Sequence, residues 1–156
     1  MIDKYYSAIY EDERKGALLM GVCRGRISEG LDFSDDAARM VIVIGIPFPQ
    51  MYDAKVILKK NYLDSRVKCQ LSGRDWYNQQ ATRSVNQAIG RVIRHVQDYG
   101  AVVLIDSRYT FQSNKSQISK WLRDSIKEHS QFDSFDSRII DFYQLMKSRN
   151  FQPKVK

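Results

Sequence analysis

The chain has 156 residues, of which 43% are hydrophobic and 28% charged, with a formal net charge of +7 and a pI near 9.4. This length and apolar content suit one folded domain and argue against a largely disordered chain. The sequence has no apolar run of about eighteen residues and no secretory leader pattern, so we expect neither a membrane span nor a signal peptide. The positive charge favours a polyanionic partner, because Lys and Arg that face phosphates release bound counterions.

Apolar runs and helical periodicity predict an alternation of helices and strands. The predicted helices are 3–12, 53–68, 74–95, 116–129 and 134–148, and the predicted strands are 17–23, 40–46 and 101–106. Because the strands are almost wholly apolar, we expect an α/β fold with a mainly parallel sheet that helices cover on both faces. Residues 1–150 form one unit in this interpretation, and 151–156 form a frayed tail. A sheet of three strands leaves an edge exposed, so we expect marginal stability in isolation.

The first polar motif begins in the strand predicted at 17–23 and runs from Gly21 to Phe33. Its three glycines predict an irregular loop at a strand end, where α/β sheets place ligand contacts. The polar side chains of this loop are Glu29, Asp32, Arg24, Arg26 and Ser28. Two alternatives stay open, since Ser28 also suits the N-cap of a helical turn and both arginines also suit a solvated surface.

The second motif, Gln87 to Arg94, lies on the longest predicted helix. At about 100° per residue, Gln87, Arg91 and Arg94 fall on one stripe of such a helix. The opposite face is apolar and consists of Ala81, Val85, Ala88, Ile89 and Val92. Gly90 inside the helix indicates a close approach to the backbone, because glycine there is destabilising by about 1 kcal/mol relative to alanine. Two guanidinium groups beside an amide suit a polyphosphate, although the same stripe also suits a solvated helix face.

Together, the two motifs resemble the second RecA-like motor domain of superfamily 2 helicases, in the iron-sulfur DNA helicase family that includes the XPD helicase. Gly21–Phe33 resembles motif V of that family, and Gln87–Arg94 resembles its motif VI. The likeness extends through Val41–Pro49, Leu71–Tyr77, Val85–His95, Asp98–Ala101 and Asp106–Tyr109. It covers nearly the whole chain, and it is strongest to the branch that regulates telomere elongation and next to the Fanconi anaemia group J branch.

The resemblance implies roles for the motif residues. Arg91 and Arg94 are expected to be arginine fingers that reach the γ-phosphate of ATP, and Gln87 is expected to contact that phosphate or its attacking water. The residues expected to couple nucleotide state to the DNA groove are Glu29, Gly30, Asp32 and Gly90. The residues expected to contact DNA are Arg24, Arg26 and Ser28.

The resemblance also implies a setting. It predicts ATP and Mg²⁺ as cofactors, held mainly by a first motor domain, which is itself an expected partner. It predicts single-stranded DNA or DNA junctions as the nucleic-acid partner, with 5′ to 3′ unwinding in replication, repair or telomere maintenance. The expected location is the nucleus.

Two family motifs are absent from these residues. The sequence has no Gly-x-x-x-x-Gly-Lys-Ser/Thr loop and no Asp-Glu-Ala-His box, both of which belong to the first motor domain. Its two cysteines, Cys23 and Cys69, cannot supply the four thiolates of an iron-sulfur cluster, so we expect the cluster elsewhere in the parent protein. We therefore interpret the chain as a partial motor domain that is not active alone. The alternative is a stand-alone, non-catalytic fragment that binds nucleic acid or a partner.

Several other side chains have both a functional and a structural interpretation. Asp35 and Asp36 suit a solvated turn better than a metal site, and no metal site is expected, because neither histidine has a second His or a Cys at ligand spacing. Trp76 and Tyr77 suit either base stacking or core packing. The basic residues of the helix predicted at 53–68 suit a solvated face better than a DNA track, and they are Lys55, Lys59, Lys60, Arg66 and Lys68.

Overall fold

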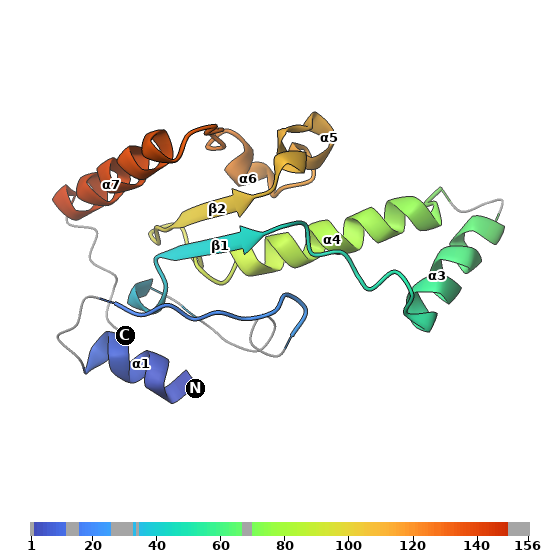
Figure 1. Ribbon diagram of the computed structural model, residues 1–156, viewed down its shortest axis with the longest axis horizontal. Helices are drawn as coiled ribbons and strands as arrows, with labels where there is room; N and C mark the ends of the chain where they lie inside the picture. The colour runs from blue at the N-terminus through green and yellow to red at the C-terminus, as the bar shows by residue number, and fades with distance from the viewer. Residues whose placement is uncertain (1, 12–15, 26–32, 34, 67–69, 150–156) are drawn as a thin grey trace.

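The computed structural model describes residues 2–11, 16–25, 33, 35–66 and 70–149. In chain order, its elements are α1 Ile2–Tyr10, the 3-10 turn η1 Asp35–Ala37, β1 Met40–Ile44, α3 Ala54–Ser65, α4 Gly73–Ile89, β2 Ala101–Ile105, the 3-10 turn η2 Ser107–Thr110, α5 Gln112–Lys115, α6 Lys120–Arg123 and α7 Phe132–Ser148. The two strands lie at the centre, with α5, α6 and α7 beside β2 and α1 beyond β1 (Figure 1). Within these ranges, no helix has both the length and the apolar character needed to cross a membrane.

The two strands pair in parallel, with Met40 beside Ala101 and Ile44 beside Ile105. Successive residues of a strand point to opposite faces, so Val43 is 3% exposed whereas Ile44 is 79% exposed. A parallel sheet with helices confirms the predicted α/β class. The expected cover on both faces is wrong for the described residues, because the face that bears Ile44 and Ile105 is exposed.

The strand predicted at 17–23 is wrong. Residues 16–22 have no regular secondary structure, and the apolar side chains of Leu18, Met20 and Val22 are exposed. A strand forms only when a neighbouring strand accepts its hydrogen bonds. In the described part of the chain the sheet consists of β1 and β2, so no described strand pairs with this apolar segment.

The core lies between the sheet and α4. Its buried cluster consists of Val43, Val85, Ile89 and Ile118. Val85 and Ile89 are four residues apart and therefore share one face of α4. The side chain of Asn86 on the same helix accepts hydrogen bonds from the backbone N–H of Ser119, at 3.0 Å, and from its hydroxyl, at 2.9 Å. These bonds hold the chain around Ile118 against α4.

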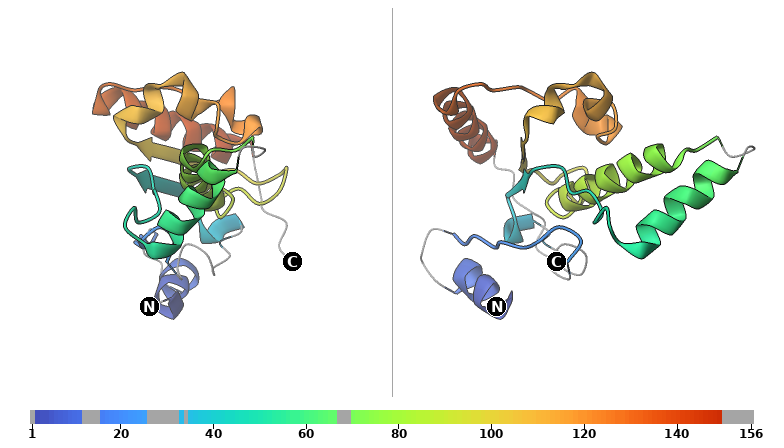
Figure 2. Two further views of the ribbon diagram at one scale, coloured as in Figure 1. Left: turned by 90° about the vertical axis from the view of Figure 1, so that its right-hand side faces the viewer. Right: turned by 45° about the vertical axis from the view of Figure 1, so that its right-hand side comes forward.

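Helices α3 and α4 pack against each other and form an arm that extends away from the sheet (Figure 2). Asp53 caps the N-terminus of α3, and Ser72 caps that of α4. At the joint, the backbone N–H of Gly73 donates to Asp64 Oδ1 at 2.7 Å. A Cβ on Gly73 would lie 2.6 Å from the backbone oxygen of Lys60, so only glycine permits this close helix contact.

The helix predicted at 116–129 is wrong, because α5 ends before residue 116 and, after a break at 116–119, α6 is only a short helix. Ile118 turns into the core at this break, and the N–H of Ser119 bonds to Asn86 rather than continuing a helix. The helix predicted at 134–148 is confirmed as α7. The hydroxyl of Tyr143 on α7 donates to the backbone oxygen of Arg39 at 2.5 Å, which ties α7 to the start of β1.

Candidate functional site

The residues from Gln87 to Arg94 lie at the end of α4 and in the loop that follows it. The predicted helix through residue 95 is wrong, since α4 ends at Ile89. Arg91 and Arg94 therefore lie beyond the helix, and the single helical stripe that joined them to Gln87 does not exist. Gln87 and Arg94 are exposed and Arg91 is partly exposed. Their roles in phosphate contact stay predictions.

The helix ends because the chain tightens and turns Val92 into the core. The N–H groups of Arg91 and Val92 bond to carbonyls three residues back, at 3.1 Å each, which is the tighter 3-10 pattern. Val92 is 3% exposed. A Cβ on Gly100 would lie 2.5 Å from Val92 Cγ1, so glycine at position 100 makes room for this side chain.

Gly90 is the C-cap of α4 and not an interior helix residue. Its φ is −65°, a value that any residue adopts, and its N–H donates to Asn86 O at 3.0 Å. A Cβ there would meet Asn86 O at 3.4 Å, which is ordinary contact. No group in the described part of the chain therefore comes unusually close to the backbone of Gly90. A close approach by a ligand stays a prediction.

Asp98 holds the backbone of Arg94. Its side chain has no exposed area. Asp98 Oδ2 accepts a hydrogen bond from the backbone N–H of Arg94 at 3.0 Å, and Asp98 Oδ1 accepts from Arg39 Nη1 at 2.9 Å and from the N–H of Tyr99 at 2.9 Å. A buried carboxylate is stable only when it is paired and hydrogen-bonded, and this one meets both conditions.

Arg39, which directly precedes β1, is the partner that neutralises Asp98. Its other amino group donates to Asp36 Oδ1 at 2.7 Å, and its guanidinium carbon lies 4.1 Å from the centre of the Tyr99 ring. Burial works against the charge of Arg39, but the hydrogen bond to Asp36, the charge interactions with Tyr99 and Asp36, and the bond to Asp98 together raise its pKa above the ordinary value. The side chain thus stays charged and joins three segments.

His95 is not isolated in space, although its sequence neighbours offer no partner. His95 Nε2 lies 2.9 Å from Asp35 Oδ1, and Asp36 pairs with Arg39 at 2.7 Å, so both carboxylates of this turn have side-chain partners. Ligand atoms of Asp35, His95 and Asp98 lie within 4.8 Å of one another. Both Asp98 oxygens already accept donors, and the Arg39 guanidinium is one of them. This donor set does not suit a cation.

Arg24 is the one DNA-contact candidate that falls within the described ranges. Its guanidinium donates to Pro47 O at 3.2 Å and to Gln80 O at 2.6 Å, so it links the segment that ends at Gly25 to the residues after β1 and to α4. Its φ of 66° is unusual for a residue other than glycine. The remaining predicted residues of this motif lie outside the described residues, and they are Arg26, Ser28, Glu29, Gly30 and Asp32.

A polar cluster at the carboxyl end of the sheet was not assigned a role from the sequence. Two hydrogen bonds from the Arg108 guanidinium lower the pKa of Asp106 to about 2. Burial raises the pKa of Tyr109 to about 12, and its hydroxyl lies 3.5 Å from Gly45 O. Polar residues directly after a parallel strand are the signal that marks this edge.

Both the aromatic and the basic candidates contact aromatic rings of this chain. The Tyr77 ring stacks on Phe48 with centroids 5.2 Å apart, and its hydroxyl donates to Pro49 O at 2.7 Å, which favours the packing interpretation over base stacking. The cationic groups of Lys59 on α3 and of its C-cap, Arg66, lie over the Tyr62 ring at 5.4 and 4.5 Å. Both basic side chains are exposed, which suits a solvated face and a DNA track alike, and Lys68 lies outside the described residues.

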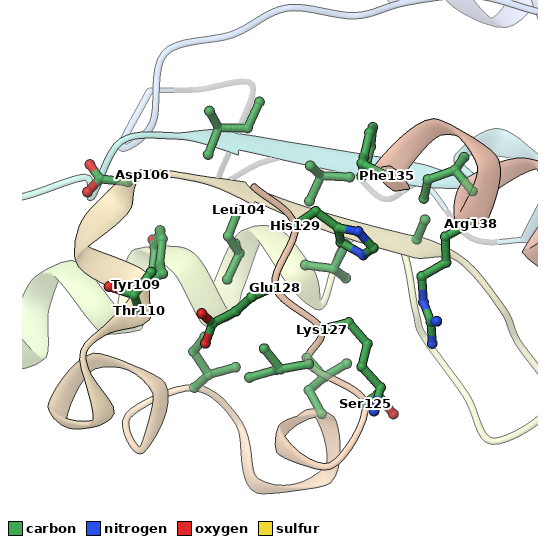
Figure 3. Close-up of a pocket in the computed structure, with 18 of the residues that line it drawn as sticks. Leu104, Asp106, Tyr109, Thr110, Ser125, Lys127, Glu128, His129, Phe135 and Arg138 are labelled. Carbon is green, nitrogen blue, oxygen red and sulfur yellow. The ribbon is translucent and has the colours of Figure 1, made fainter. Parts of the chain in front are cut away.

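A cavity of about 830 Å³ lies between β2 and the segment that carries α6 and α7 (Figure 3). Its lining is mainly apolar and does not include Gln87, Arg91 or Arg94. Polar groups at its edge pair with each other, since Lys115 bonds to Glu128 and His129 Nδ1 lies 3.0 Å from Ser134 Oγ.

Comparisons with known proteins place these features in context. The family model "Helicase C-terminal domain" matches residues 1–125. The chain is 46% identical over 157 aligned residues to "Regulator of telomere elongation helicase 1 homolog" of Drosophila melanogaster, and the alignment covers 99% of this chain and 16% of that relative. The homologues of the same name are 49% identical in Drosophila persimilis, over 94% of this chain and 15% of the relative, and 42% identical in Anopheles gambiae, over 98% and 16%. The chain thus spans only a small part of the length of these relatives.

Proposed function

Because the chain belongs to the helicase C-terminal domain family, which has a RecA-like fold, we propose that it forms part of the second motor domain of an ATP-dependent DNA helicase. One observation carries the proposal. Gln87 is exposed on the last turn of α4, and Arg94 is exposed on the loop after it, where the buried Asp98 binds the backbone N–H of Arg94. An amide and a guanidinium are thus presented from ordered backbone, as contact with a nucleotide on a neighbouring domain requires.

In this proposal, Arg91 and Arg94 act as arginine fingers on the γ-phosphate of ATP held by a first motor domain. Guanidinium groups stabilise the charge that develops on the transferred phosphoryl group, an effect of about 10³ to 10⁵ in rate in related NTPases. Gln87 contacts the γ-phosphate or orients the attacking water. ATP and Mg²⁺ are bound mainly by the first motor domain, and this chain supplies the donors that complete the site when the domains close.

The loop after residue 20 couples this site to DNA. We assign the coupling to Glu29, Gly30 and Asp32, with Gly90 on the nucleotide side, and the DNA contacts to Arg24, Arg26 and Ser28. The bonds of Arg24 to Gln80 O and Pro47 O support the assignment. They connect the start of the loop to α4, the helix that also carries Gln87, so a displacement of one is transmitted to the other.

The names of the relatives support a setting for this activity. Their names refer to regulation of telomere elongation, and we propose telomere maintenance, replication or repair in the nucleus as the process. The substrate is single-stranded DNA or a DNA junction, unwound from 5′ to 3′. The iron-sulfur cluster of this family belongs to another part of the parent protein.

The experiment that tests the proposal measures DNA-stimulated ATP hydrolysis by this chain alone, by a separately expressed first motor domain of a relative, and by the mixture. Hydrolysis that appears only in the mixture supports the proposal. No gain in the mixture, with circular dichroism showing that the chain is folded, contradicts it and favours a non-catalytic binding fragment. A single-strand DNA titration by fluorescence anisotropy, done in parallel, measures the binding function separately.

A further inference from the structure

Asp98 is a buried carboxylate bonded to the backbone of a proposed finger residue. With no exposed side-chain area, it cannot contact a nucleotide or DNA itself. Both of its oxygens accept hydrogen bonds, one from the N–H of Arg94 and the other from Arg39 and the N–H of Tyr99. Asp98 can therefore affect a bound ligand only indirectly, through the positions of Arg94, Arg39 and Tyr99.

Asp98 closes the loop that carries Arg94. The carboxylate binds the N–H of Arg94 at 3.0 Å, and the N–H of Asp98 donates to His95 O at 3.0 Å. Two bonds across residues 94–98 restrict the φ and ψ angles that this short loop adopts. The Arg94 side chain is exposed, so the direction in which it leaves the domain depends on this backbone restraint.

Arg39 connects the loop to the sheet. Its guanidinium binds Asp98 Oδ1 at 2.9 Å and Tyr99 O at 3.1 Å, and its carbonyl accepts the N–H of Ala101 at 2.9 Å, next to the first residue pair of the two strands. The backbone of Arg94 is thus joined to β1 through one carboxylate and one guanidinium.

We infer that Asp98, supported by Arg39, is a positioning residue that sets the direction of the Arg94 finger. This inference rests on the proposed function. Effective transition-state contacts require placement within a fraction of an ångström, and a displacement of about 1 Å reduces rate by about 100-fold. Loss of the Asp98 carboxylate therefore lowers kcat, whereas the KM for ATP and the affinity for DNA, which depend on other contacts, change little.

The test uses a chimeric helicase in which this chain replaces the matching segment of the Drosophila melanogaster relative. Asp98→Asn turns one acceptor into an amide donor that opposes Arg39 or the N–H of Arg94. The variants are Asp98→Asn, Arg94→Ala and the double variant. Asp64→Asn is the matched control, because Asp64 also accepts a backbone N–H, that of Gly73, but lies in the arm. The readouts are kcat and KM for ATP, the Kd for single-stranded DNA, and thermal melting.

The expected result is a fall in kcat of about 100-fold for Asp98→Asn, with KM and Kd within about twofold, and no further loss when Asp98→Asn is added to Arg94→Ala. An unchanged kcat overturns the inference, and so does an independent, multiplicative loss in the double variant. Full activity of Arg94→Ala instead overturns the proposed function. If Asp98→Asn does not fold, Arg39→Lys decides: it keeps the charge but not the fork of donors, so kcat must fall, and an unchanged kcat overturns the inference.

Discussion

The α3–α4 arm and the connection from Gly90 to Gly100 lie at opposite ends of the same helix and are stabilised differently. In the arm, Asp53 and Ser72 cap N–H groups two or three residues ahead of them. In the connection, the principal side-chain bonds join residues far apart in sequence, 59 positions for Arg39 to Asp98 and 60 for His95 to Asp35. One end of α4 is therefore locally determined, and the other depends on the folded sheet.

This difference matters because the proposed fingers lie on the long-range side. The arm forms from capping and helix contact, which need few distant residues. The orientation of Arg94 needs β1, the η1 turn and the buried Asp98 to be in place. A domain built in this way presents the proposed finger only when the sheet and the η1 turn are in place.

The largest expected effect separates function from stability at the connection. In the chimeric helicase, Arg94→Ala should lower DNA-stimulated ATP hydrolysis by about 10³-fold or more, because the finger stabilises transition-state charge. The melting temperature and the affinity for DNA should stay close to those of the parent, since the side chain is exposed. Arg74→Ala is the control, as Arg74 is an exposed arginine in the first turn of the arm helix. Retained ATPase activity would refute the finger assignment.

The second prediction reverses this pattern in the arm. Gly73→Ala places a Cβ 2.6 Å from the backbone oxygen of Lys60, and we expect a loss of about 1–3 kcal/mol in the free energy of unfolding, measured by urea denaturation. ATPase activity per folded molecule should not change. Gly90→Ala is the control for stability, because its nearest contact is an ordinary 3.4 Å. Equal stability losses in the two variants would contradict the steric argument.

The sequence predicts the locally determined parts well. The apolar strands at 40–46 and 101–106, the helix start expected at 74 and the helix α7 are confirmed, because periodicity is a short-range property. The end of α4 was placed six residues too late. Val92 turns inward there because Gly100 leaves room for it, a contact that helical periodicity does not contain.

The same limit applies to the candidate site. Residue type and family likeness predict roles for Gln87, Arg91 and Arg94, but the sequence does not indicate that Asp98 holds the backbone of Arg94. That role depends on Arg39, which lies more than fifty residues earlier and meets Asp98 only after the two strands pair. A buried charge pair between distant residues leaves no pattern in a single sequence.

A smaller effect is expected from the cap that begins α4. Ser72→Ala removes the hydroxyl that accepts the N–H of Asp75 at 3.0 Å, so the free energy of unfolding should fall by about 1 kcal/mol. Ser72→Gly should lower the free energy of unfolding by only a few tenths of a kcal/mol, since glycine leaves the N–H groups open to water. Urea denaturation of both variants checks the ranking. A larger loss for glycine than for alanine would show that the hydroxyl is not the important group.

The smallest effect tests whether a local pair outside the arm behaves in the same way. Asp106 and Arg108 are two residues apart at the end of β2, and the hydrogen bonds from Arg108 hold the pKa of Asp106 at about 2, below its ordinary 3.8. The pKa of Asp106 is lower in the folded state than in the unfolded state. The pair therefore stabilises the fold at pH values above the ordinary pKa of 3.8 and loses this contribution as pH falls toward 2. The difference in unfolding free energy between the parent and Asp106→Asn should therefore be greatest near neutral pH, shrink as pH falls below 3.8 and vanish below about pH 2. A difference that stays constant across this range would mean that Asp106 acts through packing and not through its charge.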